Sequence, residues 1–546
     1  MKNIFSTLIV ALIFLAGCDS FLEEENKSNV TAEDFYVTEE GYSALINAGY
    51  SSLRTLYGQD PWMFASGTDL YTDGRNQSPV GLAGYTQLNA SAEGVDFIYL
   101  NAYVAIQRAN TALHYATLTE PTDDLDKHVA EMKFIRANAY FLLVQSYGGV
   151  ALITELVDEA ITEFDRAEAA DVYALIIQDL EEALPNLPDG TFDGHVTKRA
   201  AQDILAKVHL TRAYESFAAS DDFSKAASYA DAAIGGQSLT QSFEELWTPG
   251  NEMNEEVIFS VQFDAASIST APTELGNQQQ NYFGSYTGGT EVAGDAPYKS
   301  YNLCPTRFAL DLFEQGDERW DATFMTEVYA RYYDYFDVAD HSSLEVVHFY
   351  APSWYSSADS LAYVSALSAD ELVNFRYHKY GDYDPEGGDI SGNYATIIVK
   401  KFDDPTSRFA SNGNDAYTST RDVVVSRLGE TYLVAAEAYL GAGSDATALD
   451  RINEVRSRAN VADLTAIDID VILDERGREL MGEYKRWFDL KRTGKLVERA
   501  SAHNPQVSTL NFAGNNGTQK ILRPIPQSAL DLNQNPEFNQ NPAYAK

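Results

Sequence analysis

A pattern of large and small apolar residues occurs twice in this chain and limits the folds that it can adopt. In both copies the pattern occupies one predicted helix and continues on the next, at the same offsets. The first copy comprises Leu210, Ala213, Tyr214 and Phe217, followed by Ala226, Ala230 and Ala233, and the second comprises Tyr432, Ala435, Ala436 and Tyr439, followed by Ala448, Ile452 and Val455. Small residues let two antiparallel helices approach closely, and large residues fill the groove to the next pair.

The spacing of both copies matches the tetratricopeptide repeat, in which two antiparallel helices form one unit. Apolar residues also recur at helical spacing through the rest of the first half. The predicted helices cover 39–57, 93–118, 124–147 and 169–184, and a polar, glycine-rich loop covers 58–92. We therefore expect a mainly α fold, in which tetratricopeptide-like helix pairs form a superhelical scaffold.

A long segment, residues 240–420, separates the two copies. It lacks helical periodicity and is rich in Gly, Ser, Thr, Asp and Tyr. A structureless loop of this length is rare in a compact domain, so we expect an inserted, loop-rich subdomain with short strands, one of them over 254–261. The scaffold is then divided into a first part, 31–239, and a second part that includes the C-terminal tail, 421–546.

The N-terminus has the form of a lipoprotein signal. Residues 1–17 contain Lys2, an apolar stretch too short to span a bilayer, and small residues directly before Cys18. Cleavage at this point would leave Cys18 to be acylated, and several acyl chains make a stable membrane anchor. Residues 18–30 are acidic and polar and are expected to form a solvated tether. The alternative is an ordinary signal peptide that happens to contain a cysteine.

The second cysteine, Cys304, has no disulfide partner once Cys18 is acylated. We expect a buried, inert thiol at this position and no nucleophile.

The net charge excludes several classes of partner. The chain has 81 acidic and 39 basic residues, which gives a formal charge of −42. Nucleic-acid binding needs a basic face, so a nucleic-acid partner is excluded. The same negative field favours a neutral ligand over a polyanionic one.

The most distinctive motifs lie in the C-terminal third. They read RDVVVSRLGETYLVAAEAYL at 421–440, INEVRSRA at 452–459, ILDERGRELMGEYKRWFDLKR at 472–492 and LRPIP at 522–526. Three upstream segments accompany them, namely ADVYALIIQDLEEALPNLP at 170–188, NEEVIFSVQF at 254–263 and CPTRFALDLFEQGDERW at 304–320. In this order, and with the lipoprotein signal, the motifs resemble the SusD/RagB family of outer-membrane nutrient-binding lipoproteins from Bacteroidetes. The resemblance covers essentially the whole mature chain and is weakest in the insertion.

The resemblance implies a binding role. Proteins of this family face the cell exterior, capture an oligosaccharide and deliver it to a partner SusC-like TonB-dependent transporter in the outer membrane. In the RagB branch, which remains the alternative, the ligand is a peptide. The family's helical repeats face the transporter, and its ligand site is built from the first interhelical loop and the insertion. A lipid-anchored hydrolase and a structural lid without a ligand are further alternatives.

The charged residues of these motifs lie among Leu and Ala on predicted helices, so we expect buried Arg–carboxylate pairs with a structural role. They are Arg427, Glu430, Glu437, Arg456, Glu475, Arg476, Glu479, Glu483, Arg486 and Asp489. Glu475 and Glu479 share a helix face, which leaves a catalytic interpretation open. No nucleophile or separated acid/base pair accompanies them, so we expect no enzymatic activity.

Two segments combine aromatic rings with polar side chains, as a sugar site requires. From 61–77 and from the aromatic-rich stretch 282–355, the candidate ligand-binding residues are Asp69, Tyr71, Asp73, Arg75, Asn76, Tyr282, Tyr286, Trp354 and Tyr355. The alternative is that these aromatic residues form the core of the subdomain itself. Phe308, Phe313 and Trp320 fall at helical spacing and are assigned to packing.

Motifs for metals and cofactors are weak. Asp382, Asp384 and Glu386 open like a calcium-binding loop, but the position that should carry the bidentate glutamate is Asn393. The eight histidines show no zinc motif, and no phosphate- or dinucleotide-binding glycine motif occurs. We expect no cofactor.

Overall fold

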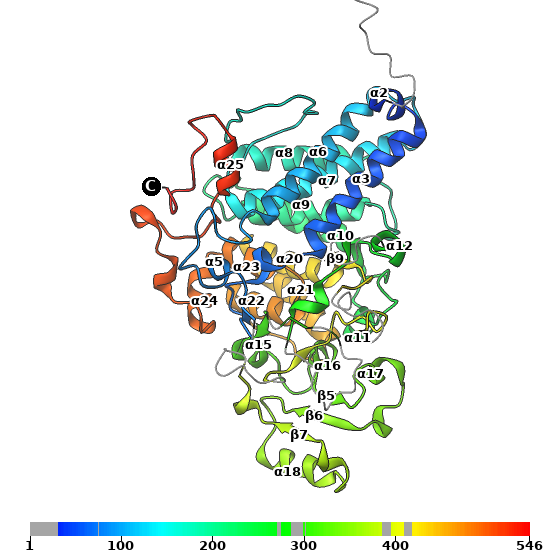
Figure 1. Ribbon diagram of the computed structural model, residues 1–546, viewed down its shortest axis with the longest axis vertical. Coiled ribbons are helices and arrows are strands. Elements are labelled where there is room, and N and C mark those ends of the chain that lie inside the picture. The colour runs from blue at the N-terminus through cyan, green and yellow to red at the C-terminus, as the bar shows by residue number, and fades with distance from the viewer. Residues whose placement is uncertain are drawn as a thin grey trace, which may run out of the picture.

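A layer of long helices forms one end of the molecule, and a segment rich in loops and short strands forms the other (Figure 1). This computed structural model describes residues 31–545, apart from 75, 270–274, 285–296, 298, 301, 385–394 and 409–417. The fold is mainly α-helical, as predicted. Among the described residues, no helix combines the length and the hydropathy needed to cross a bilayer.

The helices of the first half follow the predicted periodicity. They are α2 (Ala32–Phe35), α3 (Glu39–Gly58), α4 (Trp62–Ala65), α5 (Val80–Gly84), α6 (Phe97–Tyr115), α7 (Leu125–Tyr147), α8 (Ala169–Ala183), α9 (Lys198–Arg212) and α10 (Asp222–Ile234). Three long helices start and end within one residue of their predicted bounds, and α6 is shorter than predicted. Side-chain caps fix several starts, as at Thr38, whose hydroxyl accepts a hydrogen bond from Gly41 N and begins α3.

The first copy of the repeat is shifted from the prediction. Residues 210–217 were expected on one helix, but α9 ends at Arg212, and Tyr214 lies beyond it with 38% of its surface exposed. The reason is a polar cluster around Asp222, a fully buried carboxylate at the start of α10. It pairs with Arg212 Nη2 at 2.6 Å and with His209 Nδ1 at 2.8 Å, and it also accepts from the backbone of the turn. These contacts end α9 early and fix the turn to α10.

The helices of the second half stack on those of the first. They are α20 (Leu428–Gly441), α21 (Asp445–Arg458), α22 (Ile469–Glu479), α23 (Arg486–Arg492), α24 (Leu496–His503) and α25 (Gln527–Leu532). Helix α10 packs against both α9 and α20, and α20 packs against α21. Ala230 and Ala436 are fully buried, and a Cβ on Gly441 would lie 2.3 Å from the ring of Phe223. The small residues therefore join helices far apart in sequence into one scaffold.

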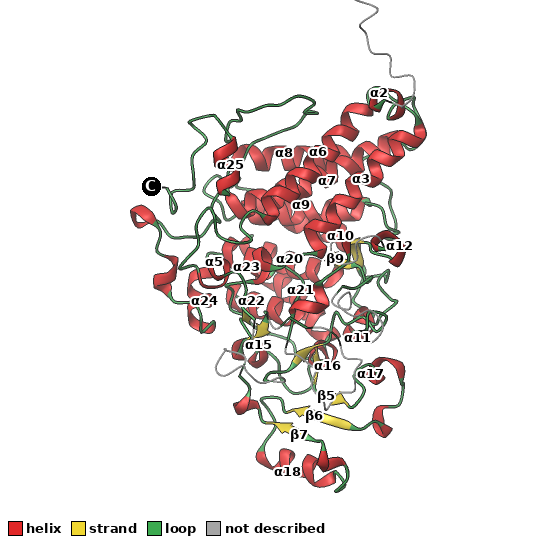
Figure 2. Ribbon diagram, viewed as in Figure 1, coloured by secondary structure: helices red, strands yellow, loops and turns green. Residues whose placement is uncertain are grey.

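Short strands and short helices make up the insertion (Figure 2). Its helices are α11 (Phe243–Trp247), α12 (Ala265–Ile268), α14 (Gln279–Tyr282), α15 (Arg307–Asp311), α16 (Glu318–Thr323), α17 (Asp334–Asp337) and α18 (Ser357–Ala366). The strands among the described residues are β1 (Tyr71–Thr72), β2 (Val257–Val261), β3 (Cys304–Pro305), β4 (Phe324–Met325), β5 (Glu327–Tyr329), β6 (Val346–Tyr350), β7 (Arg376–His378), β8 (Ile398–Val399) and β9 (Val423–Arg427). They pair as β1–β3, β2–β9, β4–β8 and β5–β6–β7.

A buried ionic network ties the insertion to the scaffold. Arg427 Nη1 lies 2.6 Å from Glu479 Oε1, and Arg427 Nη2 lies 2.7 Å from Glu483 Oε1. Arg319, on α16 of the insertion, reaches Glu475 at 2.6 Å and Glu479 at 3.2 Å. All five side chains are buried, so the predicted burial of Arg427, Glu475, Glu479 and Glu483 in Arg–carboxylate pairs is confirmed, and Arg319 joins them. Because guanidinium groups surround Glu475 and Glu479, these carboxylates form no acid/base pair open to a substrate.

A second ionic contact joins α9 to α20. Glu430 Oε2 accepts from Lys207 Nζ at 2.7 Å and lies 3.5 Å from Lys485 Nζ, and Glu430 Oε1 lies 3.6 Å from Arg476. Burial raises the pKa of Glu430, but these three cations outweigh it and lower the pKa to about 2. The ionised carboxylate is therefore favoured in the folded state.

Acid should destabilise the protein partly through this group. A lowered carboxylate pKa gives stability that is present above the unfolded pKa, near 4.5, and is lost as the pH falls toward about 2. The loss should be about 3 kcal/mol over that window. Urea unfolding at pH 7, 5, 4 and 3 should show a shallower acid dependence for Glu430→Gln than for the wild type. Glu454→Gln, at an exposed position of α21, is the control and should keep the wild-type slope.

Candidate functional site

The first interhelical loop and the insertion meet along a polar seam, which we define as residues 73, 74, 76–78, 299, 300 and 302. Asn76 Nδ2 donates to the carbonyl of Ser300 at 2.7 Å. Ser78 Oγ donates to the carbonyl of Asn302 at 3.1 Å, and Asn302 Nδ2 donates back to the carbonyl of Gln77 at 2.9 Å. Next to the seam, β1 pairs with β3. These contacts therefore fix the position of the loop relative to the insertion.

Asp73 and Gln506 close one end of the seam. Gln506 Nε2 donates to Asp73 Oδ2 at 3.0 Å, and Asp73 N donates to Gln506 Oε1 at 3.1 Å. Asp73 Oδ1 also accepts from Ser78 N at 2.9 Å. The carboxylate is buried and shapes the loop, which leaves the amides of Asn76 and Gln77 exposed at the surface. Exposed amides both donate and accept, as recognition of sugar hydroxyls requires.

Three of the predicted ligand residues are buried and held by polar contacts within the protein, so their contact with a ligand stays a prediction. Asp69 is fully buried, and its two oxygens pair with Arg486 at 2.7 and 2.6 Å. Tyr71 is 3% exposed, and its hydroxyl accepts from Gly482 N at 2.6 Å. Tyr282 is 6% exposed and donates to Gln278 at 2.6 Å. Asp69 and Tyr71 are buried because the first interhelical loop folds inward, and Tyr282 is buried at the end of α14.

The predicted residues Trp354 and Tyr355 lie elsewhere. Both are half-buried between β6 and α18, where Trp354 packs against Trp320 at 4.9 Å between ring centroids and Tyr355 packs against Phe349 at 5.5 Å. None of their described ring contacts involves a residue of the seam. The structure therefore divides the predicted site into two separate groups.

Other predicted positions fall outside the described residues, namely Cys18, Arg75, Tyr286 and Glu386. Of the calcium candidates, Asp382 and Asp384 are described. Across the described ranges, no group of three or more His, Cys, Asp or Glu side chains is arranged to hold a metal ion. Cys304 is 3% exposed, so its predicted burial is confirmed, and burial raises the pKa of its thiol to about 12.

The residues that complete the seam were missed. Ser300, Asn302 and Gln506 are ordinary polar residues of loops, and Gln506 is more than four hundred positions from its partner Asp73. No local pattern marks them, because their role depends on which loops meet.

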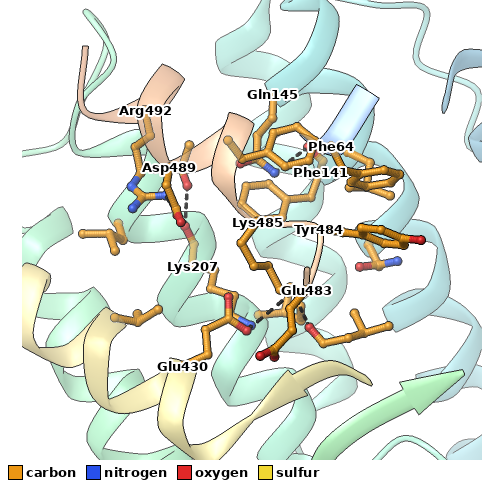
Figure 3. A pocket seen from close by; sticks show the side chains of 18 of the residues that line it. Phe64, Phe141, Gln145, Lys207, Glu430, Glu483, Tyr484, Lys485, Asp489 and Arg492 are labelled. Atoms are coloured by element: carbon orange, nitrogen blue, oxygen red, sulfur yellow. Dashed lines mark hydrogen bonds and ion pairs between the residues drawn. The ribbon is translucent and has the colours of Figure 1, made fainter. Parts of the chain in front are cut away.

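A buried cavity lies where α9, α20 and α23 meet, and Figure 3 shows its lining. Its volume is about 80 Å³, which suits a few water molecules and is well below the roughly 300–1,000 Å³ of small-molecule sites. The charges around it are paired, as in Lys207 with Glu430 at 2.7 Å and Arg492 with Asp489 at 3.1 Å. We therefore assign this cavity to the scaffold and not to a ligand.

The chain is similar to known proteins over its whole length. The sequence profile of the SusD family matches residues 255–544, and a profile described as "Starch-binding associating with outer membrane" matches residues 20–210. SusD-like protein P2 of Formosa agariphila is 27% identical, over 100% of both chains. The starch-binding protein SusD of Bacteroides thetaiotaomicron is 24% identical, over 83% of this chain and 79% of that protein.

Solved structures agree with the sequence relatives. The structure of a laminarin-binding SusD-like protein superposes with a TM-score of 0.70 at 25% identity, over 93% of this chain and 100% of that one. Because the SusD profile alone covers more than half of the residues, the fold and the motifs lead to one conclusion: the chain belongs to the SusD family.

Proposed function

We propose that this protein binds an oligosaccharide or polysaccharide at the cell surface and passes it to a SusC-like TonB-dependent transporter. The observation that carries the proposal is the seam, where the first loop and the insertion interlock and present Asn76 and Gln77 to solvent. Relatives named for starch binding and laminarin binding support a carbohydrate ligand. The protein then acts by binding and not by catalysis.

The charge supports a neutral glycan. Starch and laminarin are both uncharged glucans, and the net charge of −42 opposes uronic or sulfated chains. We propose an uncharged glycan as the ligand class for the same reason.

Anchoring completes the proposed mechanism. Acylation at Cys18 and the acidic tether 18–30 would hold the protein on the outer face of the outer membrane. A tethered binding protein presents its ligand to the transporter at high effective concentration, so moderate affinity suffices. In this proposal the helical scaffold faces the transporter and the seam faces outward.

The ligand class can be tested by affinity gel electrophoresis. The purified protein should be retarded by at least one neutral glucan, with starch, laminarin and xyloglucan as the panel. Alginate and carrageenan should retard it less, because both are polyanions. Stronger retardation by either polyanion would contradict the neutral-glycan proposal. Binding of peptides in the absence of any glycan binding would favour the RagB-like alternative.

The seam can be tested in the same gels. Asn76→Ala combined with Gln77→Ala removes two hydrogen-bonding amides and should weaken glycan binding about tenfold. Gln178→Ala removes an exposed amide on α8 and should have no effect. Trp354→Ala tests the second group of predicted residues. If this variant loses glycan binding and the double variant does not, the binding site lies near Trp354 and not at the seam.

The Asp69→Asn variant tests whether Asp69 stabilises the fold or contacts the ligand. It leaves Arg486 without its buried carboxylate partner and should lower the free energy of unfolding by about 3–5 kcal/mol in urea titrations. Unchanged stability with weakened glycan binding would show that Asp69 contacts the ligand after all.

A further inference from the structure

Helices α11 and α17 of the insertion are labelled in Figure 1. Together with the turn after β8 they line a hollow. Its volume is about 280 Å³, close to the lower end of the roughly 300–1,000 Å³ range of small-molecule sites. We call it the Lys400 hollow, and its lining includes Glu244, Trp247, Tyr335, Phe336, Lys400 and Pro405.

Lys400 is the feature that points to a ligand. It is 5% exposed, and its Nζ lies 3.4 Å from the centroid of the Tyr335 ring. In the described part of the chain, its ammonium makes no hydrogen bond and no ion pair. The two other buried lysines of that part are fully engaged: Lys401 Nζ donates to Glu483 at 2.6 Å, and Lys299 pairs with Asp403 and donates to Val399 O.

The Lys400 side chain is almost fully buried, but its Nζ is not enclosed by protein atoms, so the ammonium donors face the hollow itself. Burial lowers the pKa of Lys400 to about 8, although Glu244, Asp321 and Asp403 oppose this effect. The group is therefore still mainly protonated at pH 7, and its free donors line the hollow. A ligand oxygen would satisfy them.

The remaining walls select the kind of ligand. Glu244 is exposed at the rim and accepts from the Tyr335 hydroxyl at 3.0 Å, so a carboxylate stands near the ammonium. Phe336, Trp247 and Pro405 supply apolar surface. An anionic ligand would be attracted by Lys400 but repelled by Glu244. A neutral ligand with two hydroxyl groups avoids this conflict, because one hydroxyl can accept from the lysine and the other can donate to the carboxylate. Apolar walls with one donor and one acceptor match the C–H faces and hydroxyls of a neutral sugar ring.

The hollow is separate from the seam. A run of packed rings stands between them, from Tyr71 to Phe283 at 5.3 Å, to Phe402 at 5.8 Å and to Trp247 at 5.3 Å. Three of these rings are almost fully buried, and Trp247 at the end of the run is 8% exposed where it lines the hollow. A sugar in the hollow therefore occupies a site of its own.

We propose that the Lys400 hollow is a second carbohydrate site, which takes one neutral pyranose unit through the Lys400 ammonium, the Glu244 carboxylate and the ring of Phe336. This inference takes only the class of ligand, a carbohydrate, from the proposed function. It does not depend on where the polymer binds. A second site would let the protein hold a glycan at two points, and such bivalence raises avidity.

Saturation-transfer NMR titrations with the full mature chain test the site. The probes are the methyl glycosides of glucose, galactose and mannose, with methyl β-glucuronide as the anionic comparison. At least one neutral glycoside should bind, and Lys400→Met should raise its Kd about tenfold or more, because a charged hydrogen bond is lost. Lys379→Met removes an exposed lysine and should leave the Kd unchanged. An unchanged Kd in Lys400→Met, or preference for the glucuronide, would overturn the proposal.

Folding is checked independently. Lys400→Met removes an ammonium that makes no ion pair within the described residues but lies over the Tyr335 ring, so its melting temperature should stay within a few degrees of that of the wild type. If this variant fails to fold, Phe336→Ala serves instead and should also weaken glycoside binding. Glycoside binding lost in Lys400→Met with gel retardation by polymers retained supports two sites. If polymers retard the wild type but no glycoside binds to it, the proposed sugar site in the hollow is refuted and the proposed function stands. If a glycoside binds but no polymer retards the wild type, only the proposed function is refuted.

Discussion

Guanidinium groups buried against carboxylates hold the two halves of this molecule together. Glu479 is the centre, because it meets Arg427 at the end of β9, Arg458 on α21 and Arg319 on α16. Charges of this kind are costly to bury singly, but here each faces a partner of opposite sign. The network fixes the insertion on the scaffold with directional contacts, which apolar packing alone does not give.

The seam depends on a second set of such contacts. Asp69 lies directly below the loop, and Arg486 and Arg499 hold it from α23 and α24. Thr306, next to β3, donates to the carbonyl of Asp69 at 2.6 Å, so one residue anchors the loop to the insertion and to the C-terminal helices. The exposed amides of the seam therefore rest on a rigid base, which is the arrangement that precise recognition requires.

The helices could be predicted from the sequence almost completely and the seam only in part, for one physical reason. Helical periodicity is a local property of the sequence, so the bounds of α3, α7 and α8 could be predicted to within one residue. The small residues of α10 and α20 likewise predicted that these two helices pack closely. Whether a loop residue is buried depends on distant parts of the chain and not on the local sequence. Tyr71 and Asp69 have the composition of a sugar site, yet their loop turns inward to meet Gly482 and Arg486, more than four hundred residues away. Lys400 carries no signal in the sequence, because its neighbours Glu244 and Tyr335 come from other segments.

The pairing of β2 with β9 has a consequence for how such a chain can change over evolution. Val261 lies opposite Val423, so the insertion leaves and re-enters the scaffold at neighbouring points of one small sheet. Closing a longer or shorter loop across a fixed gap costs little, since the entropy grows only with the logarithm of length. Loops of the intervening sequence that make no contact with the scaffold can therefore be lengthened or trimmed at little cost, whereas Arg319 and Lys401 have to be kept because they pair with Glu475, Glu479 and Glu483.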